Sequence, residues 1–145
     1  MGGGKPGNTV ITLNVDTVGL IGNPGNINNL VVFTDNQSDP AENPGHPEAY
    51  LSTVNKGSTC QWQGVANNGR DIINIFSIIK KDSGGSDILN TPIPPGLQGP
   101  SGGGKTITAI VTGNAVTGVE LYTVSFSINS DSTVYTVDPR LMINS

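Results

Sequence analysis

Residues 119–128, VELYTVSFSI, decide the fold. Large apolar side chains occupy every second position from Tyr122 to Ile128, and small hydroxyl side chains occupy the positions between them. Successive side chains of a β-strand point to opposite faces, whereas an amphipathic helix repeats its apolar positions every three or four residues. This segment is therefore predicted to be a strand with one face in a hydrophobic core.

Similar short segments recur along the whole chain. Residues 9–15 alternate in the same way, and residues 58–65 place Cys60 and Trp62 on one face. Residues 71–81 are the most apolar run; they are long enough for a three-turn helix, but their β-branched content favours a central strand. The expected strands are residues 9–15, 29–34, 49–54, 58–65, 71–81, 105–112, 119–128, 132–137 and 141–143.

Turn sequences separate these segments. Asn67-Asn68-Gly69 is a strong hairpin signal, and Asp138-Pro139 should interrupt the last ladder because proline has no amide hydrogen. Longer loops are expected at residues 35–47 and 84–104. Eight or nine short strands in 145 residues predict an all-β fold. We expect one domain over residues 1–145, a two-sheet antiparallel β-sandwich of the immunoglobulin-like or jelly-roll-like kind, with a flexible glycine-rich arm at residues 1–8.

The composition excludes several classes of function. The chain has 20 Gly, 16 Asn, 14 Thr and 12 Ser, and charged residues make up 12%, about half of the usual share of roughly 25%. A net charge of -4 without a basic patch argues against nucleic-acid binding. No apolar run reaches the roughly 18 residues of a membrane span. Residues 1–7 lack the apolar stretch of a secretory signal, so we expect a cytoplasmic protein.

No group of residues predicts an enzyme. Cys60 would need a neighbouring base to act as a nucleophile, and His46 is the one histidine, so Cys60 is expected to be a small buried side chain. Residues 99–106, GPSGGGKT, match the phosphate-binding loop pattern. That loop needs a buried strand before it and a helix after it, whereas here a proline-rich segment precedes it and an alternating segment follows. Lys105 is therefore expected to be the solvated start of a strand.

The loop from residue 35 to residue 48 is rich in oxygen ligands. Calcium takes about six to eight oxygens from carboxylates, amides and carbonyls, although the spacing here does not match the twelve-residue helix-loop-helix pattern. Residues 82–87 form a smaller acidic segment, and no other cofactor is expected. Glu120 stands alone at the start of a strand and is expected to face solvent. The candidate calcium ligands are Asp35, Asp39, Glu42 and Glu48.

Three parts of the sequence carry a family resemblance. They are the strand that runs from Gly57-Ser58 to Trp62, the Tyr122-x-x-x-Phe126 strand, and the closing strand with Asp138-Pro139. In these patterns the chain resembles the bacterial inclusion-body proteins related to PixA and AidA. The resemblance implies a small β-sandwich without a signal peptide, without catalytic residues, and with a tendency to self-associate or accumulate in the cytoplasm.

Two functions of different classes stay open. The first is a non-enzymatic structural protein that assembles with itself, as a homo-oligomer or a larger assembly; the residues from Gly2 to Gly4 could dock on a neighbour. The second is a calcium-assisted carbohydrate-binding, lectin-like module that uses the loop at residues 35–48. Soluble sandwiches usually place charges on outward strand positions, so their absence here indicates a contact surface. The alternative is that long loops cover these faces within the monomer. The uncharged outward positions expected to form the contact are Thr106, Thr108, Ile110, Thr123, Ser125 and Ser127.

Overall fold

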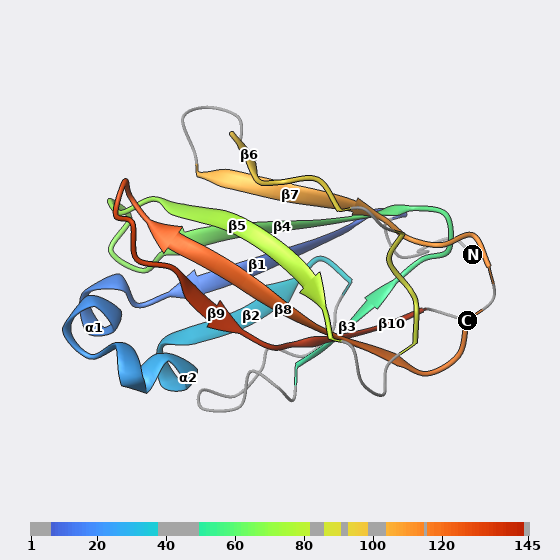
Figure 1. Ribbon diagram of the computed structural model, residues 1–145, viewed down its shortest axis with the longest axis horizontal. Helices are drawn as coiled ribbons and strands as arrows, with labels where there is room; N and C mark the ends of the chain where they lie inside the picture. The colour runs from blue at the N-terminus through green and yellow to red at the C-terminus, as the bar shows by residue number, and fades with distance from the viewer. Residues whose placement is uncertain are drawn as a thin grey trace.

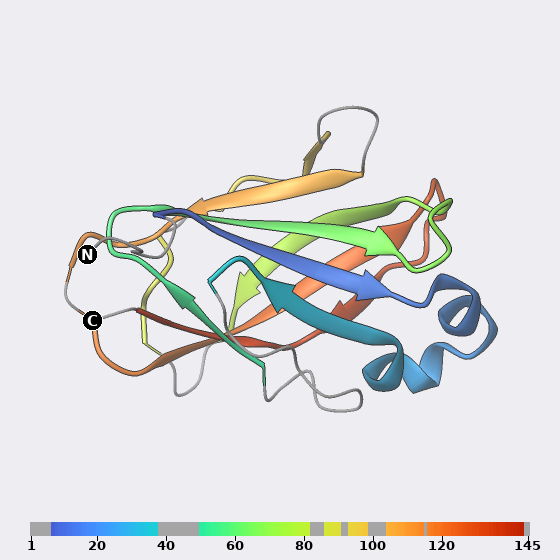
Figure 2. The ribbon, with the colours of Figure 1, turned by 180° about the vertical axis from the view of Figure 1, so that it is seen from behind.

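The computed structural model describes residues 7–37, 50–81, 86–90, 93–98, 104–114 and 116–143. The described residues form two stacked β-sheets, seen from opposite sides in Figures 1 and 2. The expected all-β two-sheet sandwich is thus confirmed. The first sheet has the spatial order β2 (Val31–Asp35), β1 (Thr9–Val15), β4 (Thr59–Ala66), β7 (Lys105–Ile110) and β6 (Leu97–Gln98).

The second sheet is built around residues 119–128, whose alternating pattern predicted the all-β fold. Its order is β3 (Leu51–Val54), β10 (Arg140–Ile143), β8 (Val119–Ile128) and β5 (Ile73–Lys80), and β9 (Tyr135–Val137) also pairs with β8. β5 pairs with one side of β8. β9 and β10 both pair with the opposite side of β8, one after the other. Asp138 and Pro139 separate them, so the predicted interruption of the last ladder is confirmed.

Both sheets are mixed rather than wholly antiparallel. β1 runs parallel to β4, and β3 runs parallel to β10; the other strand pairs in the described part of the chain are antiparallel. The partners of each parallel pair are far apart in the sequence. Alternation shows which face of a strand is buried but not the direction of its neighbour, so the sequence pattern could not reveal the parallel pairs.

The Asn67-Asn68-Gly69 turn is present, but the prediction that it closes a hairpin is wrong. β4 and β5 belong to different sheets, so the turn carries the chain from one sheet to the other. The Asn68 side-chain oxygen accepts hydrogen bonds from the backbone N–H groups of Arg70 and Asp71 at 2.9 and 3.1 Å. This side-chain turn redirects the backbone after Gly69, whose φ is +71°, and prevents the two strands from pairing.

The apolar segment at residues 71–81 is a strand, as predicted, but it lies at the edge of its sheet and not in the centre. Its free edge is covered by the chain around β6 and β7. A Cβ atom at Gly96 would collide with the carbonyl oxygen of Ile75, and one at Gly104 would collide with that of Ile73. Glycine therefore lets the first sheet lean against the edge of the second.

Helices α1 (Thr17–Gly22) and α2 (Ile27–Leu30), with a 3-10 turn, η1 (Pro24–Asn26), between them, connect β1 to β2 at one end of the sandwich (Figure 1). The Asp16 side chain caps α1 by accepting a hydrogen bond from the Gly19 N–H at 3.1 Å. Six and four residues are too few to show a helical repeat, so the sequence analysis missed both helices. Neither helix approaches the length of an apolar membrane-spanning helix, and the described residues contain no other candidate.

The core lies between the two sheets. Trp62 of β4 donates its indole N–H to the hydroxyl of Tyr122 on β8 at 3.1 Å, and the two rings meet edge to face. Phe126 stacks against Tyr135 with 5.5 Å between ring centroids. Trp62, Val124 and Phe126 occupy positions that alternation assigned to one strand face, and they are fully buried, as is Ile75.

Candidate functional site

One face of the first sheet points away from the core and is named the uncharged face. Strand pairing aligns Thr34, Thr12 and Gln63 in a row across three strands, and it places Thr108 opposite Gln61. No charged residue stands among the described outward positions of this face. These positions hold Val10, Thr12, Asn14, Val32, Thr34, Thr59, Gln61, Gln63, Val65, Leu97, Thr106, Thr108 and Ile110.

Side-chain hydrogen bonds hold the polar residues of the uncharged face in place. Gln63 donates to the Thr12 hydroxyl at 3.0 Å, and Asn14 donates to the Thr34 hydroxyl at 3.1 Å. Asn14 also donates to the backbone carbonyl of Val32 at 3.0 Å. Each of these bonds joins neighbouring strands, so the amide groups lie along the sheet and form a surface of fixed shape.

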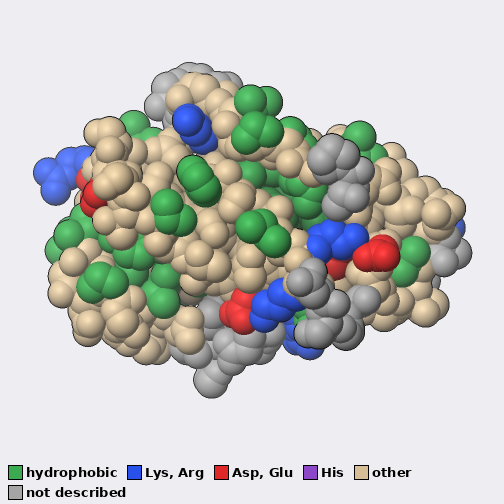
Figure 3. All heavy atoms as spheres, in the orientation of Figure 1, with side chains coloured by type: hydrophobic (Ala, Val, Ile, Leu, Met, Phe, Trp, Pro, Cys, Tyr) green, Lys and Arg blue, Asp and Glu red, His purple; other side chains and the backbone are tan. Residues whose placement is uncertain are grey.

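The opposite face of the sandwich has a different character. Arg140 is on the outer side of the second sheet, and Lys81 pairs with Asp138 at 2.8 Å beside it. Figure 3 views the molecule from this side, where basic and acidic side chains lie beside one another. The structure thus divides the predicted contact positions. Thr106, Thr108 and Ile110 lie on the uncharged face, whereas Thr123, Ser125 and Ser127 lie on the second sheet. Ser125 is only 8% exposed and shares a hydrogen bond with the Thr136 hydroxyl at 2.9 Å, so the prediction that it is a contact position is wrong.

Of the four candidate calcium ligands, Asp35 is the one that lies within the described residues. Its carboxylate accepts hydrogen bonds from the hydroxyl of Tyr50, the hydroxyl of Ser52 at 3.0 Å and the N–H of Gln37 at 2.8 Å. Burial and the Asp35 carboxylate raise the pKa of Tyr50, so its phenol stays a neutral donor. Asp35 thereby joins the end of β2 to the start of β3.

The other three candidates, Asp39, Glu42 and Glu48, lie outside the described residues. Among the residues that the structure describes, no three His, Cys, Asp or Glu side chains gather in a group that could hold a metal ion. The calcium site therefore stays a prediction.

Glu120 does not face solvent, so that prediction is wrong. It is 1% exposed on the inner side of β8, and its Oε1 accepts the N–H groups of Ile88 and Leu89 at 2.6 and 2.8 Å. Its Oε2 has no hydrogen-bond partner in the described part of the chain. Burial raises the pKa of Glu120, although the two backbone hydrogen bonds oppose this shift. The signal was available, because Glu120 has the same parity as Tyr122 in the alternating pattern.

Cys60 and Lys105 agree with the sequence-based expectations. Cys60 is fully buried, and burial raises the pKa of its thiol, which disfavours the thiolate needed for nucleophilic chemistry. Lys105 is the exposed first residue of a strand. A phosphate-binding loop would need a helix at this point.

Comparison with known proteins identifies the fold. No family model and no curated protein matches the chain. Among solved structures, the chain is similar to the inclusion body protein PixA from Burkholderia cenocepacia J2315. The TM-score is 0.67 and the identity is 13%, over 97% of each chain. This similarity shows that the chain has a PixA-like fold, and it confirms at the level of the fold the resemblance seen in the sequence.

Two other solved structures are less similar. A laccase from B. aclada matches with a TM-score of 0.36 and 15% identity, over 92% of this chain and 28% of the laccase. Amebosin matches with a TM-score of 0.28 and 14% identity, over 68% of this chain and 91% of that protein.

Proposed function

We propose that this chain is a non-enzymatic structural protein that assembles with copies of itself through the uncharged face. The observation that carries the proposal is the absence of charged side chains from the described outward positions of five adjacent strands. Soluble sheets normally carry charges on such positions and so resist association. Burying a charge against a second protein surface is costly, whereas the side-chain amides of Asn14, Gln61 and Gln63 already donate to threonine hydroxyls within the face.

The rim of the uncharged face adds apolar area to the contact. Val65, Leu97 and Ile110 are 46%, 63% and 57% exposed, so each would remove apolar surface from water on assembly. Two such faces can stack about 10 Å apart, as sheets do inside a sandwich. The same surface then meets itself, which produces closed two-fold pairs.

The proposal includes accumulation of the protein at high concentration in the cytoplasm. The protein with the shared fold is named an inclusion body protein. An assembly driven by uncharged side chains and apolar contacts suits a protein that accumulates to high local concentration. We therefore include a cytoplasmic location in the proposal.

Sedimentation velocity over a range of protein concentrations tests this function. We expect a dimer whose share of the protein rises with concentration. The dimer should persist at high ionic strength, because salt screens charge pairs and leaves these contacts unaffected. A monomer at every concentration would contradict the proposal.

A further inference from the structure

A groove where the edge of the second sheet meets the first sheet has the chemistry of a sugar-binding site. It lies between β5, the β6 and β7 strands, and the turn after β8, and its volume is about 410 Å³. This volume falls within the range of roughly 300–1,000 Å³ of ligand pockets. The residues that line it are Asn74, Ile75, Phe76, Gln98, Lys105, Ser127, Asn129, Ser130 and Asp131.

A β-bulge turns an aromatic ring into this groove. Ile75 pairs with Phe126 and Ser77 pairs with Ser125, so Phe76 is an extra residue without a partner on β8. Its side chain is 60% exposed, although a Phe side chain normally contributes to the core. Bulges re-aim side chains and are common beside binding sites. The bulge therefore displays Phe76 at the surface.

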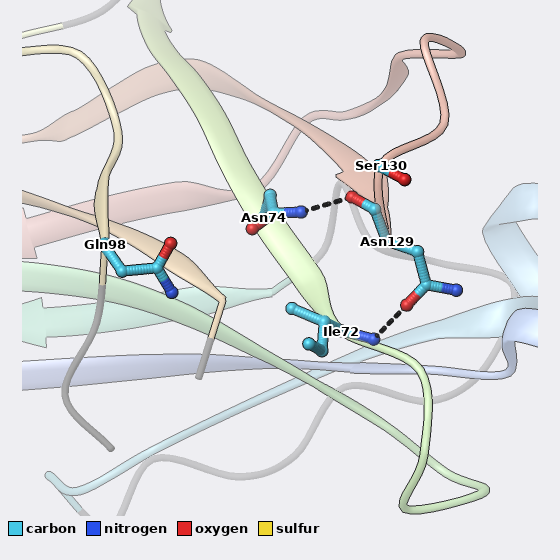
Figure 4. Close-up of a pocket in the computed structure, with 5 residues that line it drawn as sticks. All are labelled: Ile72, Asn74, Gln98, Asn129 and Ser130. Atoms are coloured by element: carbon cyan, nitrogen blue, oxygen red, sulfur yellow. Dashed lines mark hydrogen bonds between the residues drawn. The ribbon is translucent and has the colours of Figure 1, made fainter. Parts of the chain in front are cut away.

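The walls of the groove are fixed before any ligand arrives. Asn74 donates to the carbonyl of Asn129 at 2.7 Å and accepts from the Lys105 N–H at 2.9 Å. The Asn129 side-chain oxygen accepts the Ile72 N–H at 2.8 Å, and Asn129 itself has a φ of +53°. Figure 4 shows the Asn129 bonds to Asn74 and Ile72 in the adjoining pocket, which shares Asn74, Gln98, Asn129 and Ser130 with this groove. Such preorganisation lowers the entropic cost of binding.

Several polar groups around Phe76 keep unused hydrogen-bonding capacity. The hydroxyls of Ser127 and Ser130 and the ammonium of Lys105 have no partner among the described residues. The Asp131 carboxylate accepts the Thr133 N–H at 3.2 Å through one oxygen, and its second oxygen has no partner in the described part of the chain. The charges of the Lys105 ammonium and the Asp131 carboxylate cancel, so the groove has no net charge. It therefore suits a neutral ligand with many hydroxyls.

We propose that this groove binds a neutral pyranose sugar, with the apolar face of the ring on Phe76 and its hydroxyls on Ser127, Ser130, Lys105 and Asp131. Hydroxyl groups both donate and accept, so they match this mixture, and hydrogen bonds to the charged groups are the strongest of the set. A peptide strand cannot add to the β5 edge here, because Gly96 and Gly104 already lie against its carbonyls. This site needs neither calcium nor the loop at residues 35–48.

NMR titration of the ¹⁵N-labelled protein tests the inference, with methyl glycosides of glucose, galactose, mannose, fucose and N-acetylglucosamine as probes. At least one should shift the amides of Asn74, Phe76 and Asn129 in a saturable manner. Phe76→Ala should weaken that binding about tenfold, since the stacking surface is lost. Ile79→Ala is the matched control, because Ile79 is a 58% exposed apolar residue of the same strand and does not line the groove.

Three results would overturn the sugar site. The first is no shift with any probe. The second is binding that Phe76→Ala leaves unchanged, or that a calcium chelator abolishes, since the ligand would then sit elsewhere. The third is a change in sedimentation of Phe76→Ala without a change in sugar binding, which would make the groove a contact between copies of this chain. The proposed self-assembly does not depend on the first two results.

Discussion

The two outer faces of the sandwich rest on one shared core yet differ in chemistry. The first sheet presents threonines, asparagines and glutamines that bond to one another across strands, and its described outward positions carry no charge. The second presents Arg140, the Lys81–Asp138 ion pair and a bulge at Phe76. The core constrains inward positions only, so outward positions are available for function. We interpret the first face as an assembly surface and the second as a solvent-facing surface with a binding groove.

Removal of the Phe126 side chain should produce the largest loss of stability, because it weakens the core on which both faces rest. Phe126 is fully buried and packs against Tyr135, so Phe126→Ala leaves a cavity beneath both sheets. We expect a loss of about 3–5 kcal/mol in the free energy of unfolding, measured with urea. A loss below about 1 kcal/mol would show that the assignment of inward and outward faces is wrong.

The substitution Gly104→Ala should cause a smaller loss of stability, and it should affect the groove but not the uncharged face. In Gly104→Ala, the new Cβ meets the Ile73 carbonyl oxygen, so the first sheet must move away from the edge of the second. We expect a loss of about 1–3 kcal/mol together with altered sugar binding, while the assembly persists. Gly113→Ala is the control, because its Cβ has no neighbour within 4 Å, and its unfolding free energy should change by no more than about 0.5 kcal/mol. Equal effects of the two substitutions would contradict the close packing at Gly104.

Acid should weaken the end of the sandwich where the two sheets are tied together. Asp71 accepts hydrogen bonds from Thr17, Asn68 and Asn129 at 2.6, 2.9 and 3.0 Å, and these bonds lower its pKa from 3.8 to about 2. A lowered pKa in the folded state stabilises the protein above the unfolded pKa, and this stabilisation is lost as the pH falls from about 4 to about 2. Thermal unfolding should show this decline, and Asp71→Asn should reduce it. An identical pH profile in that variant would exclude Asp71 as its cause.

The sequence was sufficient for the architecture where alternation is strict. The buried faces of β8 from Tyr122 to Ile128 and of β1 from Ile11 to Val15 were predicted, because apolar side chains hold every second position there. The position of each strand within a sheet was not predictable. The extra apolar residues of β5, Phe76 and Ile79, suggested a strand buried on both faces, but they are exposed on an edge strand. Pairing direction and the course of the Asn68 turn depend on contacts between distant segments, to which a local pattern is blind.

The candidate sites were harder to predict because they, too, depend on contacts between distant segments of the chain. The uncharged positions on β7 were found, but their neighbours on β1, β2 and β4 become one surface only when the parallel pairing is known. Phe76 was counted as part of an apolar run, because a bulge leaves no mark in composition. Glu120 was assigned to solvent because it is charged, even though its parity places it inside; two backbone N–H groups offset part of the cost of its burial.

A matched pair of lysine substitutions tests the difference between the faces most directly. Thr108 and Thr123 are both outward threonines in strands, the first on the uncharged face and the second on the other sheet. Each substitution should change the unfolding free energy by only about 0.5 kcal/mol. Sedimentation velocity should show that Thr108→Lys dissociates the assembly, because its charge would be buried in the contact, while Thr123→Lys assembles like the unmodified chain. Equal assembly of both variants, or loss of assembly in Thr123→Lys alone, would contradict the account.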